Sequence, residues 1–204
     1  MNSKLIKSPE QPASVLKNLY KQTKDGSPFC NVILQIESKE FYAHKSILAS
    51  CSEFFFKMFT VEMKEKYNKK IELKDIKADI MSELLQWVYI GEITLSDENI
   101  SDILKAASLL LLGVVDVVAE HMEKSLYKTN CFLYYELADI YNLKSLKKVL
   151  DNYLCSNFDD VEVQNELLKF KSTMLFPVLA SDELNVKKEK DVFEFIIKWL
   201  KKDS

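Results

Sequence analysis

The sequence contains no arginine, so all 28 of its basic residues are lysines. The planar guanidinium of arginine is the preferred side chain for bidentate contacts with phosphates and with guanine. The formal net charge is −3, whereas nucleic-acid-binding domains usually present a basic surface. We therefore expect no nucleic-acid partner.

Glycine and histidine are also scarce. Three glycines are too few for the glycine-rich loops that bind nucleotide phosphates. The two histidines, His44 and His121, lie far apart in the sequence, and neither belongs to a spacing typical of a metal site or of acid–base catalysis. We therefore predict a protein that is not an enzyme and that needs no cofactor and no metal.

The four cysteines are few and scattered. Cys30, Cys51, Cys131 and Cys155 form no C-x-x-C pair, and each lies in or beside an apolar segment. This pattern favours reduced, mostly buried thiols over a disulfide framework or a zinc site.

Long apolar runs are missing as well. The longest, "LLLLGVV", is far shorter than the roughly 18 residues that a membrane-spanning helix needs. The first residues, "MNSKLIKSPEQ", have no apolar core followed by a small-residue cleavage site, which a secretory signal would require. We expect no membrane partner and a cytoplasmic location, with the nucleus as an alternative.

The residues that are present predict two kinds of structure in the first half of the chain. A short helix is expected over 13–22, and "NVILQIE" and "EFYAH" have the composition of a β-hairpin. Residues 45–59 repeat apolar side chains every three or four positions, which predicts one helix with Phe55 and Phe59 in its buried stripe. Phe54 and Phe56 point away from that stripe. A brief strand, "IEL", follows.

From residue 80 onward the periodicity is helical. One helix is expected to end at Gly91, a natural position for a C-terminal glycine, and the next carries an apolar face from Ile100 to Leu111. The apolar pattern is interrupted near residue 127. We therefore predict a small α+β domain over 1–127 with a short mixed sheet, followed by an all-α domain over 128–204.

Several long motifs, in order, carry a resemblance to a known family. They are "F-x-A-H-K-x-I-L-A-x-C-S-x-F-F-x-x-M-F" at 41–59, "W-V-Y-I-G-E-I" at 87–93, "L-A-D-x-Y" at 137–141 and "L-A-S-D-E-L-N-V-x-x-E-x-x-V-F-E" at 179–194. Together they resemble a BTB (POZ) domain followed by the N-terminal part of a BACK domain, as in kelch-type adaptor proteins.

The resemblance implies a homodimer that binds the N-terminal domain of a cullin-3-type scaffold and presents an unidentified substrate protein to a ubiquitin ligase. The family's hydrophobic-x-Glu contact corresponds here to Met63 and Glu65. Phe54 and Phe56 are expected to border the same surface, and Tyr89 is a weaker candidate for it. For each of these residues the alternative is an ordinary structural role.

The resemblance also assigns dimerisation to the first helix, through Val15, Leu16 and Leu19. A short helix attached by a turn is marginal alone and must pack on something. The other interpretation is that this helix folds back on its own domain, and the sequence does not separate the two.

Two departures from the family pattern bear on function. Asn31 stands where the family usually has an aspartate, so a charged groove shared with Lys45 has lost one member of its pair. The chain also stops where family members continue into a kelch propeller, which indicates either a fragment or a short form that modulates the ligase. The alternative function is a BTB oligomerisation module of a transcription-associated or cytoskeletal protein that does not bind cullin.

Overall fold

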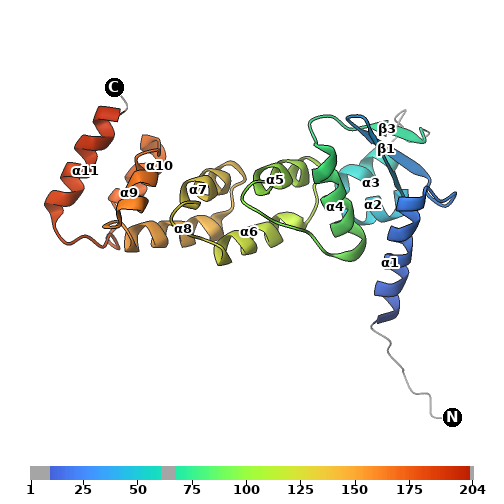
Figure 1. The fold of residues 1–204 in the computed structure, drawn as a ribbon, viewed down its shortest axis with the longest axis horizontal. Helices are drawn as coiled ribbons and strands as arrows, with labels where there is room; N and C mark the ends of the chain where they lie inside the picture. Colours follow the sequence, from blue (N-terminus) through green and yellow to red (C-terminus); the bar gives the residue numbers. More distant parts are fainter. Residues whose placement is uncertain (1–9, 61–67, 203–204) are drawn as a thin grey trace, which may run out of the picture. The chain divides into compact units, whose positions relative to one another are not determined.

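The computed structural model describes residues 10–60 and 68–202. The chain divides into two compact units, residues 1–116 and 117–204 (Figure 1). Helix α6 (Val114–Lys124) spans this boundary. The domain boundary near residue 127 stays a prediction from the sequence.

The first unit contains a three-stranded mixed sheet, as expected. Its strands are β1 (Val32–Ile36), β2 (Lys39–Ala43) and β3 (Lys70–Glu72), in the order β2-β1-β3. β1 pairs antiparallel with β2 and parallel with β3. Alternate residues of the central strand, Val32, Leu34 and Ile36, are fully buried, which is the pattern of a strand with one face on the core.

Five helices lie within the described residues of this unit: α1 (Glu10–Asp25), α2 (Lys45–Cys51), α3 (Glu53–Thr60), α4 (Ala78–Ile90) and α5 (Ile100–Leu109). α1 packs against α4 and β2, and α4 also packs against α2 and α5. α4 ends where the sequence predicts, because Gly91 adopts the left-handed conformation (φ 72°) and its N–H donates to the carbonyl of Trp87.

The single helix predicted over 45–59 is wrong. Ser52 has extended backbone angles (φ −144°, ψ 120°) and separates α2 from α3. Its hydroxyl donates to the carbonyl of Leu110 at 2.5 Å and accepts from the N–H of Phe55 at 3.1 Å. Its backbone also bridges to Leu112. A tertiary contact with the end of α5 therefore interrupts a helical periodicity that the sequence alone continues.

The second unit is helical throughout the described residues, as expected. After α6 come α7 (Cys131–Ile140), α8 (Lys144–Ser156), α9 (Val161–Leu167), α10 (Ser172–Leu179) and α11 (Glu189–Lys202). α7 packs against α8 and α9, and α8 packs against α10. The fold class, α+β followed by all-α, is confirmed.

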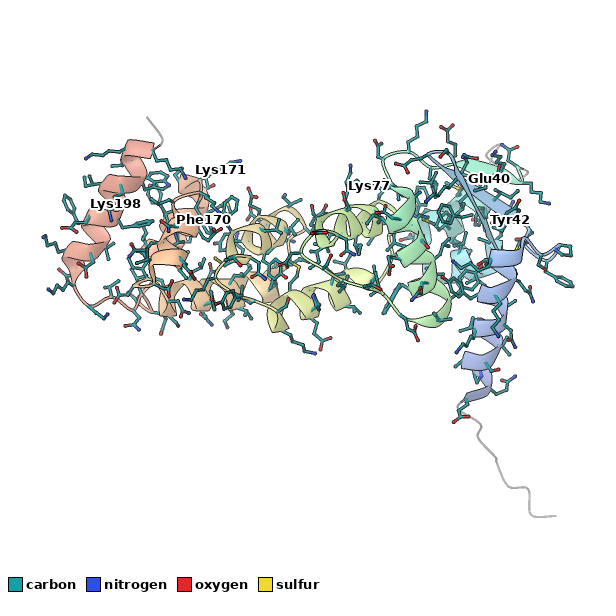
Figure 2. The ribbon with its side chains drawn as sticks, viewed as in Figure 1. Glu40, Tyr42, Lys77, Phe170, Lys171 and Lys198 are labelled. Atoms are coloured by element: carbon teal, nitrogen blue, oxygen red, sulfur yellow. The ribbon has the colours of Figure 1, made fainter. Side chains whose placement is uncertain are left out.

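Aromatic side chains form much of the core of the second unit. Tyr134, Tyr135, Phe158 and Phe195 are fully buried, and Phe158 meets Phe195 edge to face. The indole N–H of Trp199 donates to the carbonyl of Phe170 at 2.8 Å, which links α11 to the segment before α10. Phe170 is labelled in Figure 2. Each such ring is worth about 1.5–3 kcal/mol in burial.

One cysteine departs from the expectation of buried thiols. Cys30, Cys131 and Cys155 are buried and free, but Cys51 is exposed. Cys51 is the last residue of α2 and directly precedes the extended residue Ser52. None of the helices described over 10–60 and 68–202 is long and apolar enough to cross a membrane.

Candidate functional site

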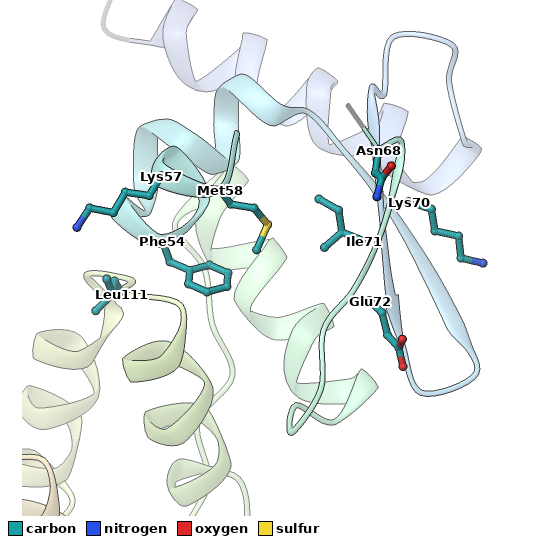
Figure 3. Close-up of a pocket in the computed structure, with 8 residues that line it drawn as sticks. All are labelled: Phe54, Lys57, Met58, Asn68, Lys70, Ile71, Glu72 and Leu111. Atoms are coloured by element: carbon teal, nitrogen blue, oxygen red, sulfur yellow. The ribbon is translucent and has the colours of Figure 1, made fainter. Parts of the chain in front are cut away.

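An apolar hollow in the first unit lies between α3 and β3. It has a volume of about 510 Å³. Figure 3 shows Phe54, Met58 and Ile71 directed toward its interior from α3 and β3. Leu111 closes one side from the turn after α5. The remaining lining residues are Lys57, Asn68, Lys70 and Glu72.

The start of α3 decides which aromatic ring faces the hollow. The Ser52 hydroxyl caps this helix, and from there Phe55 enters the core. Phe54 then lies half-buried beside it, with the two rings edge to face at 5.3 Å. Phe55 also stacks on Phe59 at 5.8 Å. Phe59 is only half-buried, so its predicted place in the core is partly wrong.

The two lysines at the rim, Lys57 and Lys70, are paired and point away from the hollow (Figure 3). Lys57 forms an ion pair with Glu53 at 2.7 Å, and Lys70 forms one with Glu40 at 2.6 Å. The exposed Lys57–Glu53 pair contributes little to stability, although it lowers the pKa of the Glu53 carboxyl. The interior of the hollow is therefore lined by the aromatic, thioether and aliphatic groups of Phe54, Met58 and Ile71. Such a lining suits an apolar side chain of another protein.

The predicted scaffold residues do not all meet at this hollow. Phe54 lines it, whereas Phe56 is 52% exposed on the outer face of α3 and is not among the lining residues. Met63 and Glu65 lie in 61–67, outside the described residues.

The prediction that Tyr89 borders the scaffold-binding surface is wrong. Its side chain is 1% exposed, because α4 turns it toward the segment that begins α2. The hydroxyl accepts from the backbone N–H of His44 at 3.0 Å and lies 2.8 Å from Nδ1 of the same residue. Tyr89 is therefore a structural residue.

The imidazole ring of His44 contacts Tyr89 on one side and Cys30 on the other. The Tyr89 hydroxyl accepts from the backbone N–H and can also donate to Nδ1, in which case the proton of the neutral imidazole lies on Nε2. Nε2 lies 3.9 Å from Sγ of Cys30. Burial lowers the pKa of His44, raises the pKa of Cys30, and raises the pKa of Tyr89 to about 12. All three groups are held neutral, which is typical of a satisfied core cluster.

Asn31 has a structural contact of its own. Its side-chain oxygen accepts from the backbone N–H of Lys45 at 2.8 Å, at the first residue of α2. The ammonium group of Lys45 lies 5.2 Å from the centre of the Phe59 ring. A neutral amide is sufficient for the contact that Asn31 makes.

The first helix presents a partly open apolar side. Val15 is 45% exposed, and Leu16 and Leu19 are half-buried. Leu16 also lines a hollow of about 580 Å³ between α1 and the end of α4, together with Trp87. The three residues predicted for dimerisation thus lie on α1 with surface still available, and the role assigned to them stays a prediction.

Three of the apolar residues that line the hollow, Met58, Ile71 and Leu111, were not predicted as site residues. Met58 was expected on the apolar stripe of a helix, and Ile71 was expected in a strand. Both lie on those elements, and both also line the hollow. Leu111 was expected on the apolar face of a helix. That helix ends at Leu109, and Leu111 is exposed with a left-handed backbone (φ 49°). No sequence signal marks this conformation, because β-turn and helix-end geometry here depend on the contact with Ser52.

Catalytic and metal chemistry have no visible site in the described part of the chain. No group of three or more His, Cys, Asp or Glu side chains is arranged there to hold a metal ion. The residues that line the α3/β3 hollow include neither histidine nor cysteine. The arrangement can bind an apolar group, and it offers no nucleophile paired with a base.

Comparison with known proteins agrees with this description. Residues 19–130 match the model of the BTB/POZ domain, and residues 131–204 match that of BACK, "BTB And C-terminal Kelch". Kelch-like protein 40 of Xenopus laevis is 31% identical over 191 residues, covering 93% of this chain and 31% of the relative. The chain therefore spans about a third of the length of the curated relatives it matches.

Two solved structures resemble the first part of the chain. The BTB domain of zebrafish PATZ1 has 31% sequence identity and a TM-score of 0.54, covering 60% of this chain and all of that one. The BTB domain of human Gigaxonin has 28% identity and a TM-score of 0.51, covering 59% of this chain and 98% of that one.

Proposed function

This chain belongs to the family of proteins in which a BTB/POZ domain is followed by a BACK region, and on that premise we propose that it is a homodimeric adaptor that binds the N-terminal domain of a cullin-3-type scaffold. Its Kelch-like relatives suggest an adaptor of this kind rather than an enzyme. In this role it forms or modulates a ubiquitin ligase and engages a separate substrate protein.

The observation that carries the proposal is the apolar hollow between α3 and β3. Protein interfaces depend on a few aromatic or aliphatic anchors that fill well-packed pockets. Here the roles are complementary: the hollow, lined by Phe54 and Met58, receives an apolar side chain of the scaffold, and the exposed Phe56 supplies contact area on the outer face of α3. Both lysines at the rim are paired with glutamates, so neither places an unpaired ammonium group beside the apolar interior.

Met63 and Glu65 extend this surface in the proposal. They follow α3 directly in the sequence, at the place of the hydrophobic-x-Glu motif. A thioether adapts to an irregular apolar slot, and a carboxylate can accept from the N–H groups at the start of a partner helix.

Calorimetry with a purified cullin-3 N-terminal domain tests the proposal. We expect the parent to bind, and we expect Phe54→Ala, Met63→Asp and Glu65→Lys each to weaken binding. An anchor at a hot spot is worth about 2 kcal/mol or more, which is a roughly 30-fold increase in Kd.

The matched control is Phe29→Ala, because Phe29 is an exposed phenylalanine of the same unit that does not line the hollow. It should bind like the parent. Circular dichroism must show that every variant is folded. A parent that does not bind would instead favour an oligomerisation module that works without cullin, and equal binding by the parent and all variants would move the contact to another surface.

A further inference from the structure

Leu111, in the turn after α5, has a backbone conformation that is unusual for a bulky residue. Its φ of 49° lies in the left-handed region, where the Cβ atom crowds the following carbonyl oxygen. The turn is a Schellman motif. The N–H of Leu112 donates to the carbonyl of Ala107 at 2.9 Å, and that of Leu111 donates to the carbonyl of Ser108 at 3.2 Å. Leu111 therefore occupies the position of this motif at which glycine is most common.

Other helices of this chain end with residues that suit the left-handed conformation. After α1 and α4 the left-handed residue is a glycine, Gly26 or Gly91. After α7 it is Asn142, with a φ of 54° and the same pair of backbone hydrogen bonds as in the turn after α5. Asparagine tolerates this conformation better than leucine does. Ending a helix in this way therefore does not require a leucine.

The core does not explain the leucine either. Its neighbours Leu110 and Leu112 are buried, whereas the side chain of Leu111 is 53% exposed. It lines the α3/β3 hollow together with Phe54 (Figure 3). A glycine or asparagine at this position would avoid the left-handed strain and would expose less apolar surface. A contact with another molecule accounts for the side chain that is found there.

Contacts with Ser52 hold the turn in this conformation. The Ser52 hydroxyl donates to the carbonyl of Leu110 at 2.5 Å, and the backbone of Ser52 bridges to Leu112. Both neighbours of Leu111 are thus fixed to the residue that precedes α3, the helix that carries Phe54. Strained residues persist where surrounding contacts determine their conformation, and they cluster at sites that bind ligands.

We propose that Leu111 is a binding residue of the α3/β3 hollow and that its side chain contacts the apolar side chain that the scaffold inserts there. The inference rests on the function proposed above and names a further residue for the same site. Phe54 and Met58 offer an aromatic and a thioether surface from α3, and Leu111 adds a branched aliphatic surface from the turn after α5. None of these three side chains offers a strong hydrogen-bonding group to a polar occupant, so together they favour an aliphatic one.

Two substitutions at this position separate the side chain from the backbone. Leu111→Ala removes the side chain beyond Cβ and keeps the left-handed strain, whereas Leu111→Gly removes both. In calorimetry with a purified cullin-3 N-terminal domain, each should raise the Kd about tenfold or more, because each removes an apolar contact at the hollow. In thermal unfolding, Leu111→Gly should melt about 2–4 °C above Leu111→Ala, because glycine adopts this conformation without crowding.

Two control variants match the features of Leu111 one at a time. Asn142→Gly changes the left-handed residue of the same turn after α7, outside the hollow. Leu109→Ala removes a leucine that is 46% exposed at the end of α5 but does not line the hollow. Both should bind the scaffold domain like the parent. Circular dichroism checks that every variant is folded.

The outcomes distinguish this inference from the proposed function. If Phe54→Ala binds more weakly than the parent but both Leu111 variants bind like the parent, the hollow binds the scaffold without Leu111 and this inference alone is wrong. If Leu109→Ala weakens binding as much as Leu111→Ala, the contact is not specific to the hollow. If Leu111→Gly melts no higher than Leu111→Ala, the argument from backbone strain fails. A parent that does not bind overturns the proposed function and this inference together.

Discussion

At the scale of single residues, the contact between Tyr89 and His44 shows how a side chain can be misread from its type. A tyrosine beside a family motif is a plausible surface residue, since its ring is apolar and its hydroxyl polar. Here the hydroxyl instead satisfies the backbone N–H and Nδ1 of His44 within the core. The same contact explains why His44 needs no metal or substrate as a partner.

Removing this hydroxyl should destabilise the protein. Tyr89→Phe keeps the ring but leaves the N–H and Nδ1 of His44 without their partner, which costs about 1–3 kcal/mol of the free energy of unfolding. Urea denaturation measures this change. The control is Tyr42→Phe on β2, whose hydroxyl has no hydrogen-bond partner among the described residues, and it should change stability by less than about 0.5 kcal/mol. Equal stability of Tyr89→Phe and the parent would contradict the assigned role.

At the scale of elements, the break between α2 and α3 aims the side chains of the candidate site. Ser52 leaves the helical conformation because its hydroxyl and backbone are engaged by the chain after α5. A new helix then starts at Glu53 with Phe55 inward, Phe54 beside the hollow and Phe56 outward. A continuous helix would have rotated these rings differently.

Ser52→Ala tests the importance of this break. It removes the N-terminal cap of α3 and leaves the carbonyl of Leu110 without its donor, so we expect a loss of about 1–2 kcal/mol in the free energy of unfolding. Thermal or urea unfolding gives the value. Ser50→Ala is the neighbouring control, because its exposed hydroxyl contacts only groups within α2, the carbonyl of Ile47 and Sγ of Cys51. A loss no larger than that of the control would show that the Ser52 cap is dispensable.

At the scale of the whole molecule, the proposed adaptor has one helix, α1, that is predicted to contact a second copy of the chain. α1 packs on α4 of its own domain and keeps Val15 exposed, so the dimer contact through this helix stays a prediction.

The contribution of α1 can be measured separately. Val15→Glu should lower the weight-average mass in light scattering at micromolar concentration, because it places a carboxylate in the proposed dimer contact. Asn18→Glu, an exposed position on the same helix, should not. A version that begins at Asp25 should behave like Val15→Glu if it remains folded by circular dichroism. A parent that is monomeric at micromolar concentration would end the dimer proposal.

The sequence by itself determined the fold class, the order of nearly all elements and the family. These depend on periodicity, on alternation as in Val32, Leu34 and Ile36, and on local signals such as Gly91, all of which act over a few neighbouring residues. Only the tertiary structure decided the burial of Tyr89, the break at Ser52, the left-handed turn at Leu111 and the hollow that Phe54, Met58 and Ile71 share. Each of these depends on a contact between segments distant in the sequence, and the energy of such a contact is not encoded in the residues on either side of it.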